Sequence, residues 1–307
     1  MNKNLVFATR PSDLARWQTQ HVISQLKSYW PDLTCEEVVI ITQGDRVLDQ
    51  PLPQIGGKGL FTYELEQALL AGRVDAAVHS LKDLPTDGPP GLSVGVIPER
   101  ADTRDVWVCP QGIGFDQLPA GSIVGTSSNR RCAQLKVYRP DLIVKPIRGN
   151  VGTRINKALE GKYDAIILAA AGIIRLGLEK HITEYLPSEI MLPAPGQGAL
   201  GIQYRADDAG TQQILEVIDH SPTRLAVTTE RTFLAVLGGG CSLPVGALAS
   251  TIGGEIEIEG IVAAEDGSQV LRISATGEDS TRLGRTLANQ ALADGAADLI
   301  AIPRVDK

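Results

Sequence analysis

Short apolar runs alternate with segments of helical periodicity through the first two-thirds of the chain. Continuous apolar runs predict buried strands, here over residues 5–9, 38–42, 76–79, 92–97, 123–126, 142–147 and 165–169. Between them, apolar residues at helical spacing predict helices over a segment that begins after Ser12 and over 60–71, 129–137 and 151–159. This alternation is typical of βαβ units, and it predicts an α/β fold with parallel or mixed sheets.

The pattern changes beyond residue 220. Strands are predicted over 247–252, 255–263 and 270–275, where Ile256, Ile258 and Val262 alternate with acidic residues. Asp266-Gly267 is a hairpin signal between two of these strands, and a last helix is predicted over 281–297. We expect a small antiparallel α+β domain here. The segment 193–198 holds two prolines and two glycines, which predicts a loop or hinge.

Composition excludes several classes of function. The formal net charge is −7 and aromatic residues make up 4% of the 307 residues. An acidic chain with few stacking platforms is a poor binder of nucleic acid or of an anionic membrane. The longest apolar run, 165–174, is half a membrane span, and the first residues lack a signal-peptide pattern. We therefore expect a cytoplasmic protein that binds neither nucleic acid nor membrane.

The cysteines point to one reactive thiol. Four widely spaced cysteines without a CxxC pair, beside four histidines, predict neither a metal site nor a disulfide framework. Cys35, Cys109 and Cys132 are interpreted as small buried apolar side chains. Cys241 follows three glycines at 238–240, and a loop of this kind presents a thiol. No histidine neighbours it in sequence, so a protease-type Cys/His pair is not indicated.

Positive charge gathers in the middle of the chain. Residues 100–175 contain twelve Lys or Arg and six Asp or Glu. Arg130 and Arg131 follow 125–128 at one predicted strand end, and Arg148 follows the next strand. Ligands of open α/β sheets bind at the carboxyl ends of strands, where helix N-termini and arginines attract anions. The pattern favours a site for a polyanionic small molecule; the alternative is a solvated arginine-rich face.

The amino-terminal part supplies matching groups. Arg10 and Ser12 follow the first strand, and the glycine-rich 56–59 opens a helix without the spacing of a nucleotide-binding P-loop. Lys82-Asp83 follows the strand at 76–79. This pair is either an exposed ion pair of little weight or a carboxylate that protonates, or stabilises, a cationic intermediate. His79 is interpreted as structural.

Together these segments resemble the porphobilinogen deaminase (hydroxymethylbilane synthase) family over essentially the whole chain. The strings that carry the resemblance stand in the family's order: Ala8-Thr9-Arg10, Gly56-Gly57-Lys58-Gly59-Leu60-Phe61, Ala77-Val78-His79-Ser80-Leu81-Lys82-Asp83, Gly125-Thr126-Ser127-Ser128, Arg130-Arg131, Arg148-Gly149-Asn150-Val151-Gly152-Thr153-Arg154, Pro195-Gly196-Gln197-Gly198-Ala199 and Gly239-Gly240-Cys241. The resemblance implies an enzyme that condenses four porphobilinogen molecules head to tail, with release of ammonia, to give hydroxymethylbilane. The enzyme is expected to be a monomer.

The resemblance also implies a cofactor and a set of site residues. A dipyrromethane is expected on Cys241 through a thioether, and Asp83 is expected to be the catalytic carboxylate with Lys82 beside it. Cofactor-binding residues are expected to be Lys58, Lys82, Asp83, Thr126, Ser127, Ser128, Arg130 and Arg131. Substrate-binding residues are expected to be Arg10, Ser12, Arg148, Gly149, Asn150, Arg154, Arg175 and Gln197. The sequence departs from the family's usual pattern at 11–16, Gln43 and Ser242.

The implied architecture is two doubly wound α/β domains of solute-binding-protein type flanking a cleft, followed by the small C-terminal domain. The domains are predicted to be 1–98 with 199–218, then 99–198 with the hinge, then 219–307. A rival interpretation is a non-catalytic polycarboxylate-binding protein of the two-domain solute-binding type. It explains the arginines but leaves Cys241 and Asp83 without roles.

Overall fold

The computed structural model describes residues 4–46, 59–240 and 243–300, so Lys58, Cys241 and Ser242 lie outside the described residues. The chain divides into two compact units. The first unit comprises Met1–Thr103, Ala171–Leu178 and Gly196–Arg224, and the second comprises Arg104–Ala170, Glu179–Pro195 and Leu225–Lys307. The three-domain boundaries given above stay a prediction.

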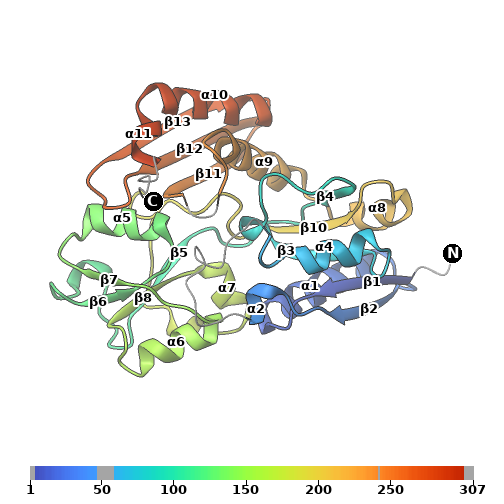
Figure 1. Cartoon of the computed structure of the whole chain (residues 1–307), viewed down its shortest axis with the longest axis horizontal. Helices are drawn as coiled ribbons and strands as arrows, with labels where there is room; N and C mark the ends of the chain where they lie inside the picture. The colour runs from blue at the N-terminus through green and yellow to red at the C-terminus, as the bar shows by residue number, and fades with distance from the viewer. Residues whose placement is uncertain (1–3, 47–58, 241–242, 301–307) are drawn as a thin grey trace, which may run out of the picture. The chain divides into compact units, whose positions relative to one another are not determined.

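A mixed five-stranded sheet forms the centre of the first unit, in the order β2-β1-β3-β10-β4 (Figure 1). Its strands are β1 (Asn4–Thr9), β2 (Thr34–Val39), β3 (Ala76–Ser80), β4 (Leu92–Val96) and β10 (Leu200–Arg205). Strand β1 pairs in parallel with β2 and β3, whereas β10 runs antiparallel to β3 and β4.

Helices cover both faces of this sheet. Phe7 and Val78 pack with Val22 and Leu26 of α1 (Asp13–Tyr29) on one face. On the other face, Ala8 and Ala77 pack with residues of α4 (Tyr63–Leu70). Neighbouring residues of a strand point to opposite faces, so two apolar residues in succession indicate a strand buried on both sides. Further elements of this unit are α2 (Gln43–Arg46), η1 (Leu81–Asp83), most of α7 (Ala170–Arg175), α8 (Ala209–Leu215) and η4 (Glu216–Ile218).

The second unit contains another mixed sheet, in the order β7-β6-β8-β5-β9. Its strands are β5 (Asp105–Val108), β6 (Ile123–Gly125), β7 (Ile143–Lys145), β8 (Ala165–Ala169) and β9 (Glu184–Tyr185), and its helical elements are η2 (Phe115–Gln117), α5 (Asn129–Tyr138), α6 (Val151–Leu159) and η3 (Glu179–His181). Helix α7 (Ala170–Arg175) follows β8. The core holds Trp107 edge-on against Phe115, with ring centroids 5.4 Å apart.

The same unit includes the antiparallel sheet β11-β12-β13. Strands β11 (Val245–Ile252), β12 (Glu255–Ala263) and β13 (Val270–Gly277) lie under α10 (Ser280–Ala293) in Figure 1, beside α9 (Ser221–Val236) and α11 (Ala296–Ile300). Ile256, Ile258 and Val262 are buried as their alternation predicts. The last helix, predicted as one piece over 281–297, is two helices, because Gly295 between them has a positive φ of +98°.

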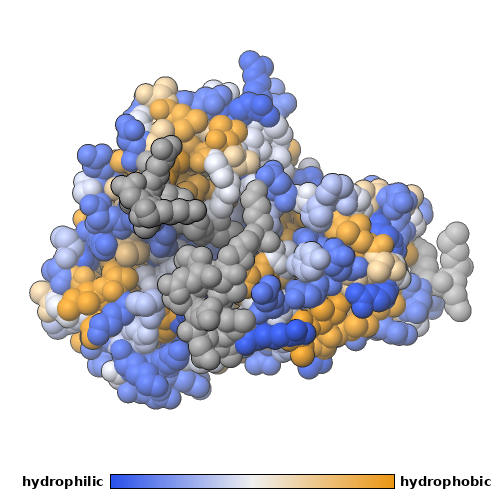
Figure 2. Space-filling model, viewed as in Figure 1, coloured by the Kyte–Doolittle hydropathy of each residue, from blue (hydrophilic) through white to orange (hydrophobic). Residues whose placement is uncertain are grey.

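The fold class is confirmed: two mixed α/β sheets and a small antiparallel C-terminal sheet. Among the elements whose bounds differ from prediction, the second strand is Thr34–Val39 rather than 38–42, and the helix predicted from residue 60 begins at Tyr63. Strands β5, β9 and β10 and helices α2, α7, α8 and α9 were not predicted. Hydrophilic residues cover much of the face in view (Figure 2). Among the described residues, no helix is long and apolar enough to span a membrane.

Candidate active site

Lys82 and Asp83 lie on the short helix η1, directly after β3. Leu81 is buried and anchors this turn, while Asp83 is exposed and Lys82 is half-buried. The Lys82 Nζ donates a hydrogen bond of 3.1 Å to Oε1 of Gln197. The sheet therefore presents an exposed carboxylate next to an oriented ammonium group, at the carboxyl end of a parallel strand.

Buried amides also bind the residues just before this pair. Gln18 Nε2 donates to Ser80 Oγ over 2.8 Å, and Gln203 Oε1 lies 3.1 Å from His79 Nε2. Burial lowers the pKa of His79 to about 4, so the ring is neutral at neutral pH. A buried, neutral and hydrogen-bonded histidine agrees with the structural interpretation.

The segment 196–198 packs against the start of η1 and against Ala101. Gly196 and Gly198 both have positive φ, and a Cβ on Gly198 would lie 2.6 Å from the carbonyl oxygen of Ala101. The carbonyl of Gly198 accepts a 2.8 Å hydrogen bond from Nη2 of Arg175. Glycine at 198 is thus required by backbone conformation and by a close approach together.

We predict that Gly198→Ala lowers the free energy of unfolding by about 1–3 kcal/mol or more, because strain at positive φ adds to a backbone clash. Gly177→Ala is the matched control, since Gly177 has φ +65° and its Cβ would meet nothing within 4 Å among the described residues. Urea unfolding of both variants measures the difference. If both variants lose the same free energy of unfolding, the close approach to Ala101 makes no contribution to the cost of Gly198→Ala.

Two arginines of the first unit are held by aromatic rings. Arg10 donates to Asp45 through Nη2 and Nε, the latter over 3.2 Å, and its guanidinium lies 4.2 Å from the Phe61 ring centroid. Burial acts to raise the pKa of Asp45, but the hydrogen bonds and charge of Arg10, with Thr42, lower it overall. The Asp45 carboxylate and the Phe61 ring together hold the Arg10 guanidinium in one orientation.

Arg175 is the second such arginine. Its guanidinium lies 5.8 Å from the ring of Trp17, which stacks on His21 with centroids 4.8 Å apart. Burial lowers the pKa of Arg175 to about 10, so the group is still charged at neutral pH.

Ser12, predicted to contact substrate, caps α1 by accepting a 3.3 Å hydrogen bond from the Ala15 amide.

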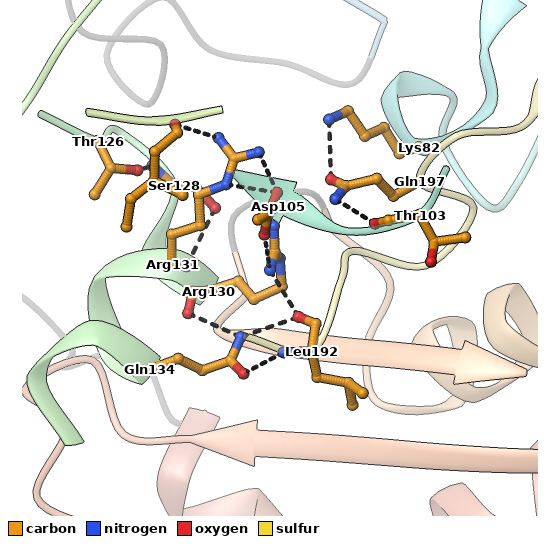
Figure 3. A network of polar contacts seen from close by, with 11 residues as sticks. Lys82, Thr103, Asp105, Thr126, Ser128, Arg130, Arg131, Gln134, Leu192 and Gln197 are labelled. Carbon is orange, nitrogen blue, oxygen red and sulfur yellow. Dashed lines mark hydrogen bonds and ion pairs between the residues drawn. The ribbon is translucent and has the colours of Figure 1, made fainter. Parts of the chain in front are cut away.

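Arg130 and Arg131, on the first turn of α5, share one buried carboxylate (Figure 3). Arg131 donates to Oδ1 of Asp105 through Nη2 at 2.7 Å and Nε at 3.2 Å, and Arg130 Nη1 lies 2.8 Å from Oδ2. Nη1 of Arg130 also donates to the Leu192 carbonyl. Burial acts to raise the pKa of Asp105, but the two guanidinium groups outweigh it and hold the pKa well below its ordinary range.

Three hydroxyl groups lie in the turn between β6 and this cluster. Ser128 caps α5 through the Arg131 amide, and Thr126 Oγ1 accepts from the Ser128 amide over 3.2 Å. Ser127 Oγ exchanges hydrogen bonds with the backbone of Ile147, donating to its carbonyl and accepting from its amide. These bonds fix the β6–α5 turn.

The segment after β7 contains a cation with an unsatisfied donor. Nη1 of Arg148 is buried and has no hydrogen-bond partner among the described residues. Gly149 has φ +116°, and its carbonyl accepts a 2.7 Å hydrogen bond from Nε of Arg154. Asn150 stands at the N-cap of α6 without a side-chain capping bond. A buried guanidinium donor without a protein acceptor is suited to an anionic ligand.

The structure thus groups the predicted residues by unit. Those of the first unit, at the ends of β1 and β3 and on the segments packed there, are Arg10, Ser12, Lys82, Asp83, Arg175 and Gln197. Those of the second unit, at the ends of β6 and β7, are Thr126, Ser127, Ser128, Arg130, Arg131, Arg148, Gly149, Asn150 and Arg154. Sequence reasoning missed Asp45 and Asp105, which hold Arg10 and the pair Arg130 and Arg131. Among the described residues, no group of three His, Cys, Asp or Glu could hold a metal.

Two family models match the chain: "Porphobilinogen deaminase, dipyromethane cofactor binding domain" over residues 5–213 and "Porphobilinogen deaminase, C-terminal domain" over 224–293. A porphobilinogen deaminase of Brevibacillus brevis is 50% identical over 295 residues, which cover 95% of each chain. Similar solved structures include a sulfate-bound OxyR2 mutant regulatory domain from Vibrio vulnificus, at 16% identity and TM-score 0.41, covering 71% of this chain and 95% of that one. The BenM effector-binding domain with benzoate has 14% identity and TM-score 0.42, covering 70% and 89%.

Proposed function

The chain belongs to the porphobilinogen deaminase family, and we propose that the side chains described above carry out the reaction of that family, the head-to-tail condensation of four porphobilinogen units into hydroxymethylbilane. The protein is a transferase of porphyrin biosynthesis. The observation that carries the assignment of roles is the Lys82-Asp83 pair at the end of β3, oriented by Gln197.

The residues of the second unit fit a group with several carboxylates. Arg148 offers a buried donor without a partner among the described residues. Arg130 and Arg131 share the Asp105 carboxylate, so this cluster has one more positive than negative charge. We assign the holding of the dipyrromethane cofactor to Thr126, Ser127, Ser128, Arg130 and Arg131, with Lys58, Lys82 and Asp83, and its thioether to Cys241. When bound, the dipyrromethane supplies the pyrrole chain end from which the product grows.

Asp83 is assigned the proton and charge chemistry on porphobilinogen. Ammonia leaves when the carbon–nitrogen bond of the aminomethyl group breaks, and a proton donor at the nitrogen eases this step. The departing ammonia leaves an azafulvenium-like cation derived from the substrate. We assign this proton transfer to the Asp83 carboxyl group, and the carboxylate left behind stabilises the cation. The Asp83 side chain is exposed, so substrate can reach it.

Substrate carboxylates are assigned to the remaining cations and polar groups. Each porphobilinogen brings an acetate and a propionate, which suit planar guanidinium donors. The proposed set is Arg10, Ser12, Arg148, Gly149, Asn150, Arg154 and Arg175. Arg10 and Arg175 are each oriented by an aromatic ring, which lowers the entropy lost when a carboxylate binds.

The proposal also covers the setting of the reaction. We assign the enzyme to the cytoplasm, as a monomer that needs neither nucleic acid nor membrane. The acidic net charge and the free thiols of Cys35, Cys109 and Cys132 support this assignment. Cys109 is buried, whereas Cys35 and Cys132 are half-buried, and burial raises the pKa of both half-buried thiols.

Intact mass spectrometry of the purified chain tests the cofactor and its anchor. We expect the native chain to be heavier than its sequence by two linked pyrrole units, and Cys241→Ala to show the sequence mass alone. Cys132→Ala is the control and should keep the added mass. A native chain that stays unmodified after incubation with porphobilinogen would favour the rival, a polycarboxylate-binding protein.

A further inference from the structure

The side chain of Gln197, which the family resemblance places among the substrate-binding groups, is fully buried. Its Oε1 accepts a 3.1 Å hydrogen bond from Lys82 Nζ, and its Nε2 donates over 2.8 Å to the carbonyl of Thr103 (Figure 3). Each end of the amide therefore has a protein partner. The bond to Thr103 fixes which end of the amide faces Lys82, because a carbonyl accepts only from the NH₂ group.

The backbone around Gln197 is held as firmly as its side chain. Arg100 Nε donates to the Gln197 carbonyl over 2.7 Å, and the Ala199 carbonyl accepts from the Leu81 amide over 3.0 Å. Gly196 and Gly198, on either side, have positive φ and pack closely on their neighbours. The oxygen that Lys82 meets is thus fixed by bonds in the backbone and the side chain.

A neutral acceptor has a specific advantage beside a catalytic carboxylate. Glutamine orients the Lys82 ammonium without placing a negative charge of its own beside it. A glutamate at this position would form an ion pair with Lys82 and compete with a substrate or cofactor carboxylate. The choice of amide therefore affects how Lys82 acts as well as where it lies.

We propose that Gln197 is a positioning residue, which holds the Lys82 ammonium in place at the end of β3 and contacts no substrate itself. This inference rests on the proposed function, in which Lys82 and Asp83 face the reacting pyrroles. The inference depends on the hydrogen bond from Lys82 Nζ to Oε1 of Gln197, and this bond can be tested without measuring enzyme turnover.

The test compares Gln197→Met and Gln197→Glu by acylation of Lys82 in the holoenzyme with N-hydroxysuccinimidyl acetate, followed by peptide mass spectrometry. Methionine keeps the shape of the side chain but loses the acceptor, so Lys82 should be acylated faster, by about five-fold. Glutamate pairs with the ammonium, so Lys82 should be acylated more slowly than in the native enzyme. For Gln197→Met, kcat/KM for porphobilinogen should fall about ten-fold or more.

Gln203→Met is the matched control. Gln203 is also buried in the first unit and bonds His79, and it has no bond to Lys82 among those described. Both methionine variants should lose stability in urea, since each removes the side-chain hydrogen bonds of a buried amide. Only the Gln197 variant should change the acylation of Lys82.

Acylation rates that stay unchanged in Gln197→Met, or that rise equally in Gln203→Met, would overturn the inference. If Gln197→Glu does not fold, the methionine pair alone decides. A native enzyme that fails to convert porphobilinogen would remove the proposed function, whereas the acylation rates would still report whether Gln197 holds Lys82.

Discussion

Asp83→Asn is expected to lower kcat for porphobilinogen by about 10²–10⁴-fold, the range that positioned acid–base groups contribute. Asparagine keeps the size of the side chain but can neither deliver the proton nor supply the negative charge. Because Asp83 is exposed on the three-residue helix η1, the substitution should leave the urea unfolding midpoint unchanged. Steady-state kinetics should show the loss in kcat with KM little changed.

Asp87→Asn provides the comparison for this experiment. Asp87 is also exposed and lies four residues further along the same connection to β4, but it follows no strand end. We expect its kcat to stay within about two-fold of the native value, as for surface substitutions in general. A kcat for Asp83→Asn within ten-fold of native would reject the assigned role and leave Asp83 as a binding group at most.

Elements with an unambiguous local pattern could be predicted to the residue. Strand β8 and helix α6 have the predicted bounds 165–169 and 151–159. Four of the five residues in β8 are buried, so its apolar run is continuous. Strand β12 also has the predicted bounds, 255–263. In its first half Ile256 and Ile258 are buried and the glutamates beside them are not, as the alternation predicts, whereas its last four residues are buried on both faces.

Elements defined by distant pairing could not be predicted in this way. Strand β10 contains Gly201, Gln203 and Arg205, and it is a strand because β3 and β4 pair with it on either side. Strand β2 is an edge strand with two glutamates, and its register is set by β1 alone among the described strands.

The same distinction between local patterns and distant contacts holds for the site residues. Strand ends indicated where Arg10, Lys82 and Arg130 should lie, because the carboxyl ends of parallel strands gather ligands. Gln197 was predicted as a substrate-binding residue from the family resemblance, but its bond to Lys82, 115 residues away, could not be predicted. Asp105 could not be predicted either, because it lies in a strand that the sequence pattern did not reveal.

Asp105→Ala is expected to be among the most destabilising single substitutions in this protein, at about 3–5 kcal/mol. The Asp105 side chain is completely buried, and the side chains of Arg130 and Arg131 are only 5% and 8% exposed. Removing the carboxylate leaves two guanidinium groups in a low-dielectric interior without their counter-charge. Urea unfolding followed by circular dichroism measures the loss, and intact mass shows whether the cofactor is still carried.

The pH dependence of stability gives an independent test of the same cluster. The folded-state pKa of Asp105 is below its ordinary value, so its contribution is complete above the unfolded pKa, about 3.9, and is lost as the pH falls toward the folded value. Native protein should therefore lose stability below about pH 4 more steeply than Asp105→Asn, which has no carboxylate to protonate there. Parallel curves for the two proteins would mean that Asp105 titrates alike in the folded and unfolded states.

Asp141→Ala separates the effect of burial from that of losing any ion pair. Arg139 and Asp141 also form a salt bridge in the second unit, at 2.7 Å, but the Asp141 side chain is 36% exposed. Water and salt screen such a pair, so its removal should change stability little. If both alanine variants unfold alike, the buried cluster contributes no more than a surface pair. If Asp105→Ala alone is unstable, the same carboxylate that stabilises the second unit also sets the orientation of the two arginines assigned to the cofactor.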